Sequence, residues 1–307
     1  MTEPGTYTVL VTPFIIKNKK NIIDYTSILK WMNIQFHFRI KNLVLHGTTS
    51  ECPTVTENEK IEICEYINNM NLTEFKNYFN IYIGVGGNCT QDCIEFANKI
   101  KKYCKGIMIT VPYYSKPPQR GISAHFKTIA NEFLDMQVIM YNVPGRSAVN
   151  MEPETMIDII NCCENVVALK EANGDLNHFK KFIELFKTTN RTLGMTFTVL
   201  SGDDINIVEH CKLGASGVIS VASNIIPKQI KQIVDLCLKQ KFTEADDILS
   251  QNKEFIKYLF VETNPIPIKE IMYLTNMYST NILRLPLVSM DTEKSKILYD
   301  MYNQLAK

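Results

Sequence analysis

The sequence predicts an α/β protein whose main part is a TIM (β/α)8 barrel, followed by a small C-terminal all-helical extension. Short apolar runs alternate with longer amphipathic stretches along residues 1–227, as strands alternate with helices in such a fold. Eight of these runs occur within about 220 residues, the number that closes a barrel. Residues 228–307 show only helical periodicity. A doubly wound open sheet is the alternative that the same alternation allows.

The predicted strands are short runs rich in apolar and β-branched residues. In chain order they are Tyr7–Thr12, Asn42–His46, Ile81–Val85, Gly106–Val111, Gln137–Tyr141, Val166–Lys170, Phe197–Ser201 and Gly217–Ser220. Unbroken apolar runs of this kind are typical of strands that helices cover on one face and a barrel interior fills on the other. The pattern therefore favours a parallel barrel.

The stretches between the strands have helical spacing, and two carry start signals. Thr56 with Glu59 predicts a capping box, and Pro153 suits a first helical turn. The barrel helices are predicted at Ile23–Phe36, Glu57–Asn69, Asp92–Tyr103, Gly121–Phe133, Glu152–Asn161, Leu176–Lys187 and Asp204–Leu213.

The C-terminal part is predicted to be a separate helical domain of residues 228–307, after a barrel domain of residues 1–227. Its helices are expected at Lys228–Lys239, Thr243–Leu259, Pro267–Leu274 and Thr292–Leu305. The sequence N-P-I-P at residues 264–267 predicts a turn between two of them, because each proline restricts its own φ and the residue before it.

Composition and charge exclude several classes of protein. The chain is 45% hydrophobic and 21% charged, with a net charge of +1 and a pI of about 7.5. It has no basic stretch of the kind that binds nucleic acid or acidic membranes. No apolar run approaches the roughly 18 residues of a spanning helix, and the first residues lack the pattern of a signal peptide. We therefore expect a cytoplasmic protein with neither a nucleic-acid nor a membrane partner.

The nine cysteines and five histidines do not predict a metal site. No C-x-x-C pair occurs, no cysteine pair lies beside a histidine pair at zinc spacing, and no H-E-x-x-H motif is present. Free thiols in a reducing compartment are the expected state.

Lys170 directly follows the apolar run Val166–Leu169, where a charged amine is costly to bury. An ordinary strand-end lysine would extend to solvent, and this alternative stays open at this point. In a barrel, however, the active site forms at the C-terminal ends of the strands. A lysine desolvated there holds more of the neutral amine, which can attack a ketone to form an imine.

Hydroxyl groups and one guanidinium follow the other strands. Thr48 lies in "HGTTSE", Tyr114 in "TVPYYSKP", and Tyr141 and Arg146 in "MYNVPGRS". Taken singly, threonines of this kind often cap helices and paired tyrosines often pack. Together with Lys170, and without a carboxylate pair or a metal set, they suit covalent amine catalysis. The hydroxyls could relay a proton, and the arginine could hold a carboxylate in a bidentate fork.

These motifs resemble the dihydrodipicolinate synthase family, in the superfamily that also contains N-acetylneuraminate lyase. The similar segments are "VLVTPF", "GTTSE", "TVPYYSKP", "YNVPGR", "ALKEANGDL", "LSGDD", "GVISV", "FVETNPIPIK" and "LRLPL". They occur in order over nearly the whole chain. The tyrosine pair, Y-N-V-P-x-R and K-E-A-x-G favour the synthase branch over the lyases.

The resemblance implies which reaction the residues at the C-terminal ends of the strands carry out. Lys170 would form the imine with pyruvate, and no further cofactor would be needed. Tyr141, Thr48 and Tyr114 would relay protons, with Tyr114 reaching in from a neighbouring subunit of a homotetramer built as a dimer of dimers.

The same resemblance implies the substrate contacts. Arg146 would bind the carboxylate of L-aspartate 4-semialdehyde, and Thr49 would help to hold that of pyruvate. Gly202 and Ile219 would line the pocket through their backbones. The product would be 4-hydroxy-tetrahydrodipicolinate, on the route to lysine and diaminopimelate.

Two departures from the family pattern carry expectations. Ser50 stands where the family usually has glycine, and it would strain the loop if the position required positive φ. Asn88, Asp92 and Tyr113 lie near positions that bind lysine in feedback-regulated members. Lys60 stands where many of these have histidine or glutamate, and its charge would repel lysine. We therefore expect weak or absent lysine inhibition.

Two other functions remain open from the sequence. An aldolase that cleaves N-acetylneuraminate or a keto-deoxy sugar acid would use the same imine, but Arg146 and Tyr114 suit a short acidic aldehyde better than a polyhydroxy chain. A catalytically silent barrel that serves as a scaffold would be marked by loss of the lysine or the relay hydroxyls, and none of these is missing.

Overall fold

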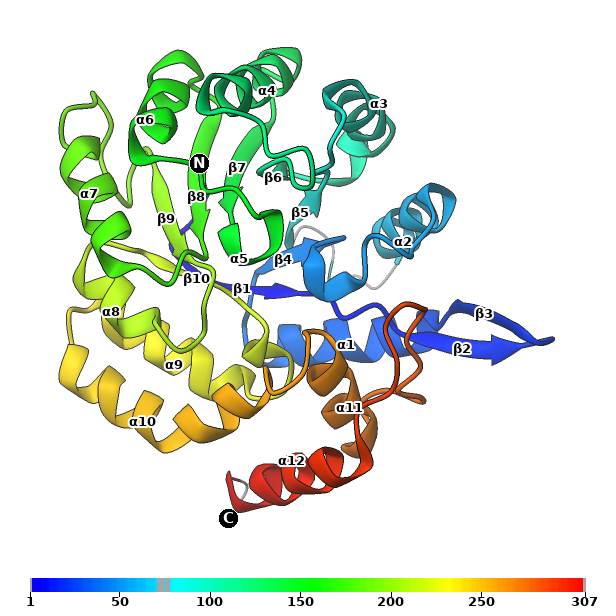
Figure 1. Cartoon of the computed structure of the whole chain (residues 1–307). Helices are drawn as coiled ribbons and strands as arrows, with labels where there is room; N and C mark the ends of the chain where they lie inside the picture. Colours follow the sequence, from blue (N-terminus) through cyan, green and yellow to red (C-terminus); the bar gives the residue numbers. More distant parts are fainter. Residues whose placement is uncertain (1, 71–74, 76–77, 306–307) are drawn as a thin grey trace.

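A computed structural model describes residues 2–70, 75 and 78–305 of the chain, and it confirms the predicted barrel. Eight parallel strands close in the order β1-β10-β9-β8-β7-β6-β5-β4, with helices around them (Figure 1). The strands are β1 (Gly5–Val9), β4 (Asn42–Leu45), β5 (Asn80–Gly84), β6 (Gly106–Thr110), β7 (Gln137–Asn142), β8 (Val166–Glu171), β9 (Thr198–Ser201) and β10 (Gly217–Ser220).

Alternation along each strand divides the apolar side chains between two cores. On β8, Ala168 belongs to the cluster inside the barrel, whereas Leu169 belongs to the larger cluster between the strands and the helices. Tyr141 of β7 also lies in the inner cluster. Because successive side chains of a strand point to opposite faces, Lys170 shares the inner face with Ala168. The strand pattern therefore turns this lysine into the barrel.

The helices that surround the barrel lie close to the predicted ranges. They are α1 (Tyr25–His37), α2 (Glu57–Asn69), α3 (Thr90–Ile100), α4 (Gln119–Glu132), α6 (Pro153–Cys162), α7 (Leu176–Phe186), α8 (Ile207–Lys212) and α9 (Pro227–Leu238). The predicted capping box of Thr56 and Glu59 is present at the start of α2. Three 3-10 turns, Thr48–Ser50, Lys101–Tyr103 and Ala222–Asn224, and a short helix α5 (Pro144–Ser147) were not predicted, because they are shorter than the window that periodicity needs.

A β-hairpin before α1 was also missed. It pairs β2 (Phe14–Lys17) with β3 (Lys20–Ile23), and its turn residues Asn18 and Lys19 have φ of 52° and 61°. Two consecutive residues of positive φ suit a tight hairpin turn, which the sequence K-N-K-K does not signal because it lacks glycine. The hairpin projects from the barrel beside the segment that follows α11 (Figure 1).

The C-terminal helices are α10 (Phe242–Tyr258), α11 (Ile266–Leu274) and α12 (Thr292–Leu305). Helix α9 packs against β1, β10 and α8, and α10 packs against both α8 and α9. Helix α9 thus continues the outer layer of the barrel, and α10 packs on α8 and α9. The division of the chain at residue 227 stays a prediction. No helix in the described part of the chain is long and apolar enough to cross a membrane.

Candidate active site

Lys170 and Tyr141 are direct neighbours at the C-terminal ends of β8 and β7, where their Cα atoms are partners in the strand register. The Lys170 amine lies 3.9 Å from the centroid of the Tyr141 ring. Lys170 is 6% exposed and Tyr141 is 4% exposed. Lys170 therefore does not extend into solvent as an ordinary strand-end lysine would, and its amine faces the phenol that the sequence predicts as its relay partner.

Thr48 and Thr49 lie in the 3-10 turn that follows β4. The turn is closed by backbone hydrogen bonds from Ser50 N–H to the Gly47 carbonyl (3.0 Å) and from Glu51 N–H to the Thr48 carbonyl (3.1 Å). Thr49 is 3% exposed, whereas Thr48 is partly exposed at the rim. Backbone N–H groups in such a turn can hold a carboxylate.

Ser50 does not strain this turn. It is fully buried and is not among the described residues of positive φ. Its hydroxyl donates to the Leu10 carbonyl at 2.6 Å, and its own carbonyl accepts from Thr12 Oγ1 at 2.7 Å. The residue of left-handed conformation is instead Glu51, with φ 54° and ψ 36°. Serine in place of glycine thus adds one hydrogen bond, from its hydroxyl to the Leu10 carbonyl, at no conformational cost.

Asn264 connects Thr49 with Arg146. The Asn264 Nδ2 donates to Thr49 Oγ1 at 3.0 Å, and Arg146 Nη2 donates to the Asn264 carbonyl at 3.2 Å. Because Thr49 accepts here, its own hydroxyl hydrogen remains available to a ligand. Asn264 is 6% exposed, and its Oδ1 has no partner among the described residues. The sequence analysis assigned Asn264 no role, although it lies in the quoted motif "FVETNPIPIK".

Arg146 is exposed at the mouth of the barrel, on the short helix α5 that directly follows β7. Pro144 begins this helix, and Ala148 ends it with φ 56°. Only the bond to Asn264 fixes the guanidinium among the described side chains and backbone groups, so most of its donors face outward. An exposed guanidinium at the mouth suits a carboxylate that arrives from solution.

Within one chain, the fold does not bring Tyr114 close to Lys170. It is 88% exposed, at φ 59°, in the loop after β6. The neighbouring Tyr113 is 40% exposed, and its N–H donates to Asn88 Oδ1 at 3.0 Å. Within the single chain, the Tyr114 side chain therefore lies in solvent and away from the buried Lys170.

Gly202 and Ile219 lie at the ends of β9 and β10. Gly202 N–H donates to the Glu171 carbonyl at 2.6 Å. A Cβ at Gly202 would lie 2.6 Å from the Ala172 Cβ, so only glycine fits this approach. Ile219 is 2% exposed and belongs to the inner cluster. Both backbones therefore border the same end of the barrel interior as Lys170.

A polar layer supports the lysine from the outer face of the sheet. Asn142 follows Tyr141, and its Nδ2 donates to both carboxylate oxygens of Glu171, at 3.1 and 3.2 Å. His178 Nε2 lies 3.6 Å from Glu171 Oε2. Burial acts to lower the pKa of His178, but the Glu171 carboxylate more than offsets it, and the net shift is upward. The side chains of Asn142 and Glu171 thus link β7 and β8 on the face of the sheet opposite to Tyr141 and Lys170.

The residues considered for lysine regulation lie on and beside α2 and α3. Lys60 Nζ lies 5.5 Å from the centroid of the Phe96 ring, so α2 directs this amine towards α3. Asn88 is engaged by Tyr113 N–H, and Asp92 lies in the first turn of α3. Lys60 therefore adds a positive charge beside α3.

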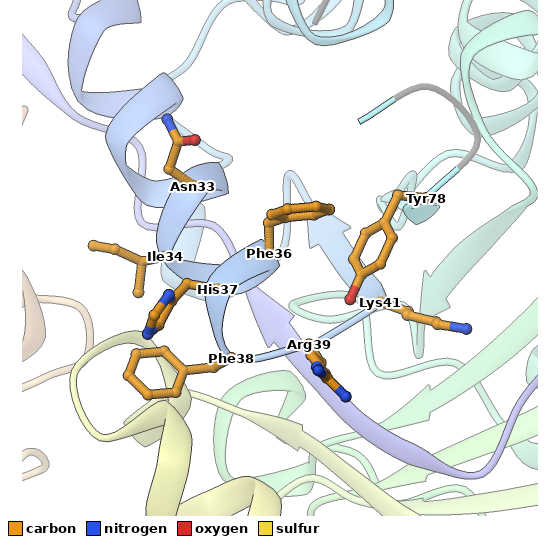
Figure 2. Close-up of a pocket in the computed structure, with 8 residues that line it drawn as sticks. All are labelled: Asn33, Ile34, Phe36, His37, Phe38, Arg39, Lys41 and Tyr78. Atoms are coloured by element: carbon orange, nitrogen blue, oxygen red, sulfur yellow. The ribbon is translucent and has the colours of Figure 1, made fainter. Parts of the chain in front are cut away.

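A large surface cavity lies away from these residues (Figure 2). Its volume is about 790 Å³, and it is lined by Asn33, Ile34, Phe36, His37, Phe38, Arg39, Lys41 and Tyr78. It adjoins the end of α1 and the chain that enters β4, and hence the N-terminal end of a barrel strand. That end of a TIM barrel serves stability and not chemistry. Basic side chains here also complement the negative end of the α1 dipole.

No group of three potential metal-ligating side chains occurs in residues 2–70, 75 and 78–305. The residues at the strand ends therefore offer an amine, hydroxyls, a guanidinium and backbone N–H groups. These groups can form an imine, move a proton and hold carboxylates.

Comparisons with known proteins agree with this chemistry. The model of the dihydrodipicolinate synthetase family matches residues 3–305. The 4-hydroxy-tetrahydrodipicolinate synthase of Aquifex aeolicus is 33% identical over 298 residues, which cover 97% of this chain and 96% of that protein. The crystal structure of dihydrodipicolinate synthase from Thermotoga maritima matches with a TM-score of 0.91 at 31% identity and covers 99% of both chains. That of Acinetobacter baumannii, solved in complex with pyruvate, matches with a TM-score of 0.89 at 28% identity and also covers 99% of both chains.

Proposed function

This chain belongs to the dihydrodipicolinate synthetase family, and from that membership we propose that it condenses pyruvate with L-aspartate 4-semialdehyde. The product is 4-hydroxy-tetrahydrodipicolinate, an intermediate of lysine and diaminopimelate biosynthesis. The enzyme is a class I, imine-forming, pyruvate-dependent lyase. The observation that carries the mechanism is the buried Lys170 amine over the Tyr141 ring at the C-terminal end of the barrel.

The first half of the reaction activates pyruvate. The Lys170 amine attacks the ketone carbon to give a carbinolamine, which takes up a proton and loses water to give the protonated imine. The imine withdraws electrons from the adjacent methyl group, so that loss of a methyl proton yields an enamine. Tyr141 and Thr48 pass these protons in this scheme, which the position of the Lys170 amine 3.9 Å from the centroid of the Tyr141 ring supports. The Thr48–Thr49 turn supplies the N–H groups and hydroxyl for the pyruvate carboxylate.

The second half joins the aldehyde. The enamine carbon attacks the aldehyde carbon, whose oxygen takes a proton and becomes the hydroxyl of the product. The amino group of the substrate then attacks the imine carbon, closes the ring and releases the Lys170 amine. Arg146 at the mouth holds the substrate carboxylate in this scheme, and Tyr114 completes the proton relay from a second chain. Gly202 and Ile219 border the pocket.

The first experiment is intact mass spectrometry after incubation with pyruvate and borohydride. The wild-type protein should gain the mass of one reduced pyruvate per chain, and Lys170→Ala should gain none. Lys127→Ala, which removes a partly buried lysine of the outer helix α4 that pairs with Asp158 at 2.7 Å, is the control and should still gain the adduct. Absence of the adduct in the wild-type protein would refute the imine mechanism and favour a silent scaffold.

Assembly, cofactor use and location follow from the same proposal. The enzyme works as a homotetramer built as a dimer of dimers, it uses the lysine imine and no other cofactor, and it acts in the cytoplasm. The exposure of Tyr114 supports the assembly. The nine unpaired cysteines, five of them buried, support a reducing compartment.

A further inference from the structure

The turn that carries Thr48 and Thr49 ends in a buried ion pair. Glu51 closes the turn in the left-handed conformation, and its carboxylate accepts a hydrogen bond from Lys269 Nζ of α11. Both side chains are 0% exposed. A pair buried this deeply contributes little net stability, because desolvation of the two charges offsets their attraction. The pair is therefore better explained by its effect on the geometry of the turn than by a gain in stability.

The second oxygen of the Glu51 carboxylate is also engaged. The backbone N–H of Arg284 donates to Glu51 Oε2 at 3.0 Å. The Arg284 guanidinium donates to the Thr54 carbonyl at 2.9 Å and pairs with Glu59 at 2.5 Å. Two carboxylates and two cations thus form a neutral cluster around residues 51–54, at the start of α2.

Phe14 of the β2–β3 hairpin confines this cluster. Its ring centroid lies 4.3 Å from Lys269 Nζ and 4.4 Å from Arg284 Cζ. Lys269 also donates to the Ile282 carbonyl at 3.0 Å. The side chains of Lys269 and Arg284 are therefore fixed in position, and both residues belong to the C-terminal extension and not to the barrel.

The same segment of the extension reaches the turn at a second point. Asn264, five residues before Lys269, donates to Thr49 Oγ1 as described above. One stretch of chain, residues 264–269, therefore holds the side chain of Thr49 and the residue that closes the turn. Neither contact involves a barrel strand.

We propose that the Glu51–Lys269 pair positions the Thr48–Thr49 turn for catalysis, which makes the C-terminal extension a working part of the active site. The inference rests on the proposed function. Without the pair, the Glu51 carboxylate keeps only the Arg284 N–H as a partner, so the left-handed Glu51 is held less firmly, and the Thr48 hydroxyl and the turn N–H groups shift with it. A displacement of about 1 Å in such groups can cost about 10²-fold in rate. Glu51 and Lys269 are positioning residues, since neither touches the reacting atoms.

The test compares Glu51→Gln, Lys269→Met and the double variant with the wild-type protein. The glutamine keeps the shape of residue 51 and removes its charge, and the double variant removes the unpaired charge that each single variant leaves. Arg191→Met is the matched structural control. Arg191 donates to the carbonyls of Val166 (2.7 Å) and Cys163 (2.8 Å), at the opposite end of β8 from Lys170.

Amide hydrogen exchange measures the turn without reference to activity. Residues 47–55 should exchange at least about tenfold faster in all three pair variants, and at the wild-type rate in Arg191→Met even where its Tm is lower. Unchanged exchange of this segment in a folded Glu51→Gln protein would overturn the positioning role. Failure of the wild-type protein to trap pyruvate would instead overturn the proposed function, so the two failures are distinct.

Steady-state kinetics then separate positioning from folding. At a temperature where circular dichroism shows all variants folded, kcat/KM for pyruvate should fall about 10- to 100-fold in both single variants. The double variant should regain Tm but not kcat/KM, and Arg191→Met should keep the wild-type value. A double variant with wild-type kcat/KM, or single variants within twofold of it, would show that the pair is only structural.

Discussion

At the residue scale, burial separates the two basic residues that the proposed mechanism uses. Lys170 is 6% exposed and faces a phenol ring, whereas Arg146 is exposed at the mouth. A primary amine held inside the barrel beside a phenol can act as the nucleophile towards a ketone. A guanidinium stays charged under all these conditions and suits recognition of a carboxylate. The two residues can therefore be tested independently.

Arg146→Ala should reduce kcat/KM for L-aspartate 4-semialdehyde by roughly 10²-fold, because it removes charge-assisted hydrogen bonds to the substrate carboxylate. Trapping of pyruvate by borohydride should be largely unchanged, since Lys170 and Tyr141 are untouched. Arg146→Lys should be nearly as poor as the alanine variant, because an ammonium lacks the planar fork. Synthase turnover that survives the alanine substitution would show that the assigned role is wrong.

Ser50→Gly should lower the free energy of unfolding by about 1 to 2 kcal/mol, because it deletes the buried bond from Ser50 Oγ to the Leu10 carbonyl and adds backbone freedom to the unfolded chain. Activity should stay within about twofold, since the position does not need positive φ. Urea denaturation and initial rates test both statements. A more stable glycine variant would indicate strain at Ser50.

The difference between predicted and missed site residues has a physical reason. Lys170 could be found from the sequence because its strand context is local and a charged residue there is anomalous. Asn264 touches Thr49 across 215 positions of the chain, and Lys269 meets Glu51 across 218. No periodicity or local signal encodes contacts of that separation. Only the fold brings these residues to the rim.

At the element scale, a titratable side chain of α7 packs against the end of β8. His178 at the start of α7 faces Glu171 across 3.6 Å, and Glu152 and Asp175 add negative charge nearby. The pKa of His178 is raised in the fold, so protonation stabilises the folded state. This contribution is fully present below the ordinary pKa of about 6.5 and is lost as the pH rises through the folded value.

The Tm of the wild-type protein should therefore contain a component that decreases as the pH rises from about 6.5, and His178→Asn should lack it. His125→Asn is the matched control. Burial lowers the pKa of His125 to about 4, so this histidine is neutral at every pH used in the scans below. Calorimetric scans between about pH 5.5 and 8.5 measure both slopes. Equal slopes for wild-type and His178→Asn proteins would contradict the role of the Glu171–His178 contact.

The contact between α2 and α3 bears on regulation. Lys60 places a positive charge beside Phe96 of α3, the helix whose first turn contains Asp92, and a lysine ligand that approached this helix would meet like charge. We expect no inhibition at submillimolar lysine in initial-rate assays. Lys60→Glu should lower the half-maximal lysine concentration by replacing repulsion with attraction. Half-maximal inhibition of the wild-type enzyme at submillimolar lysine would refute the expectation.

The order of elements was predictable because strands and helices of a barrel repeat a strong local pattern. All eight predicted strands are present, and the boundaries move by only a few residues. The hairpin of β2 and β3 escaped prediction because its turn uses Asn18 and Lys19 at positive φ in place of glycine. This omission matters, because Phe14 of the hairpin contacts both cations that hold the active-site turn.

At the scale of the whole molecule, the single chain holds most of the proposed site but leaves Tyr114 outside it. The phenol is 88% exposed, whereas Lys170 and Tyr141 are buried at the strand ends. In a dimer with twofold symmetry, each chain would offer its Tyr114 to the site of the other. The relay would then exist only in the assembled enzyme, and dilution to the monomer would abolish turnover.

Complementation between inactive chains tests this arrangement directly. We expect Lys170→Ala to be inactive and Tyr114→Phe to be strongly impaired. A mixed dimer contains one site with both lesions and one site with the intact Lys170 and the intact Tyr114 of the other chain. Random pairing after co-expression should therefore restore about a quarter of the wild-type activity per site. Mixing the purified proteins without subunit exchange is the control. If co-expression restores nothing while mass measurements show mixed dimers, Tyr114 must serve the site of its own chain.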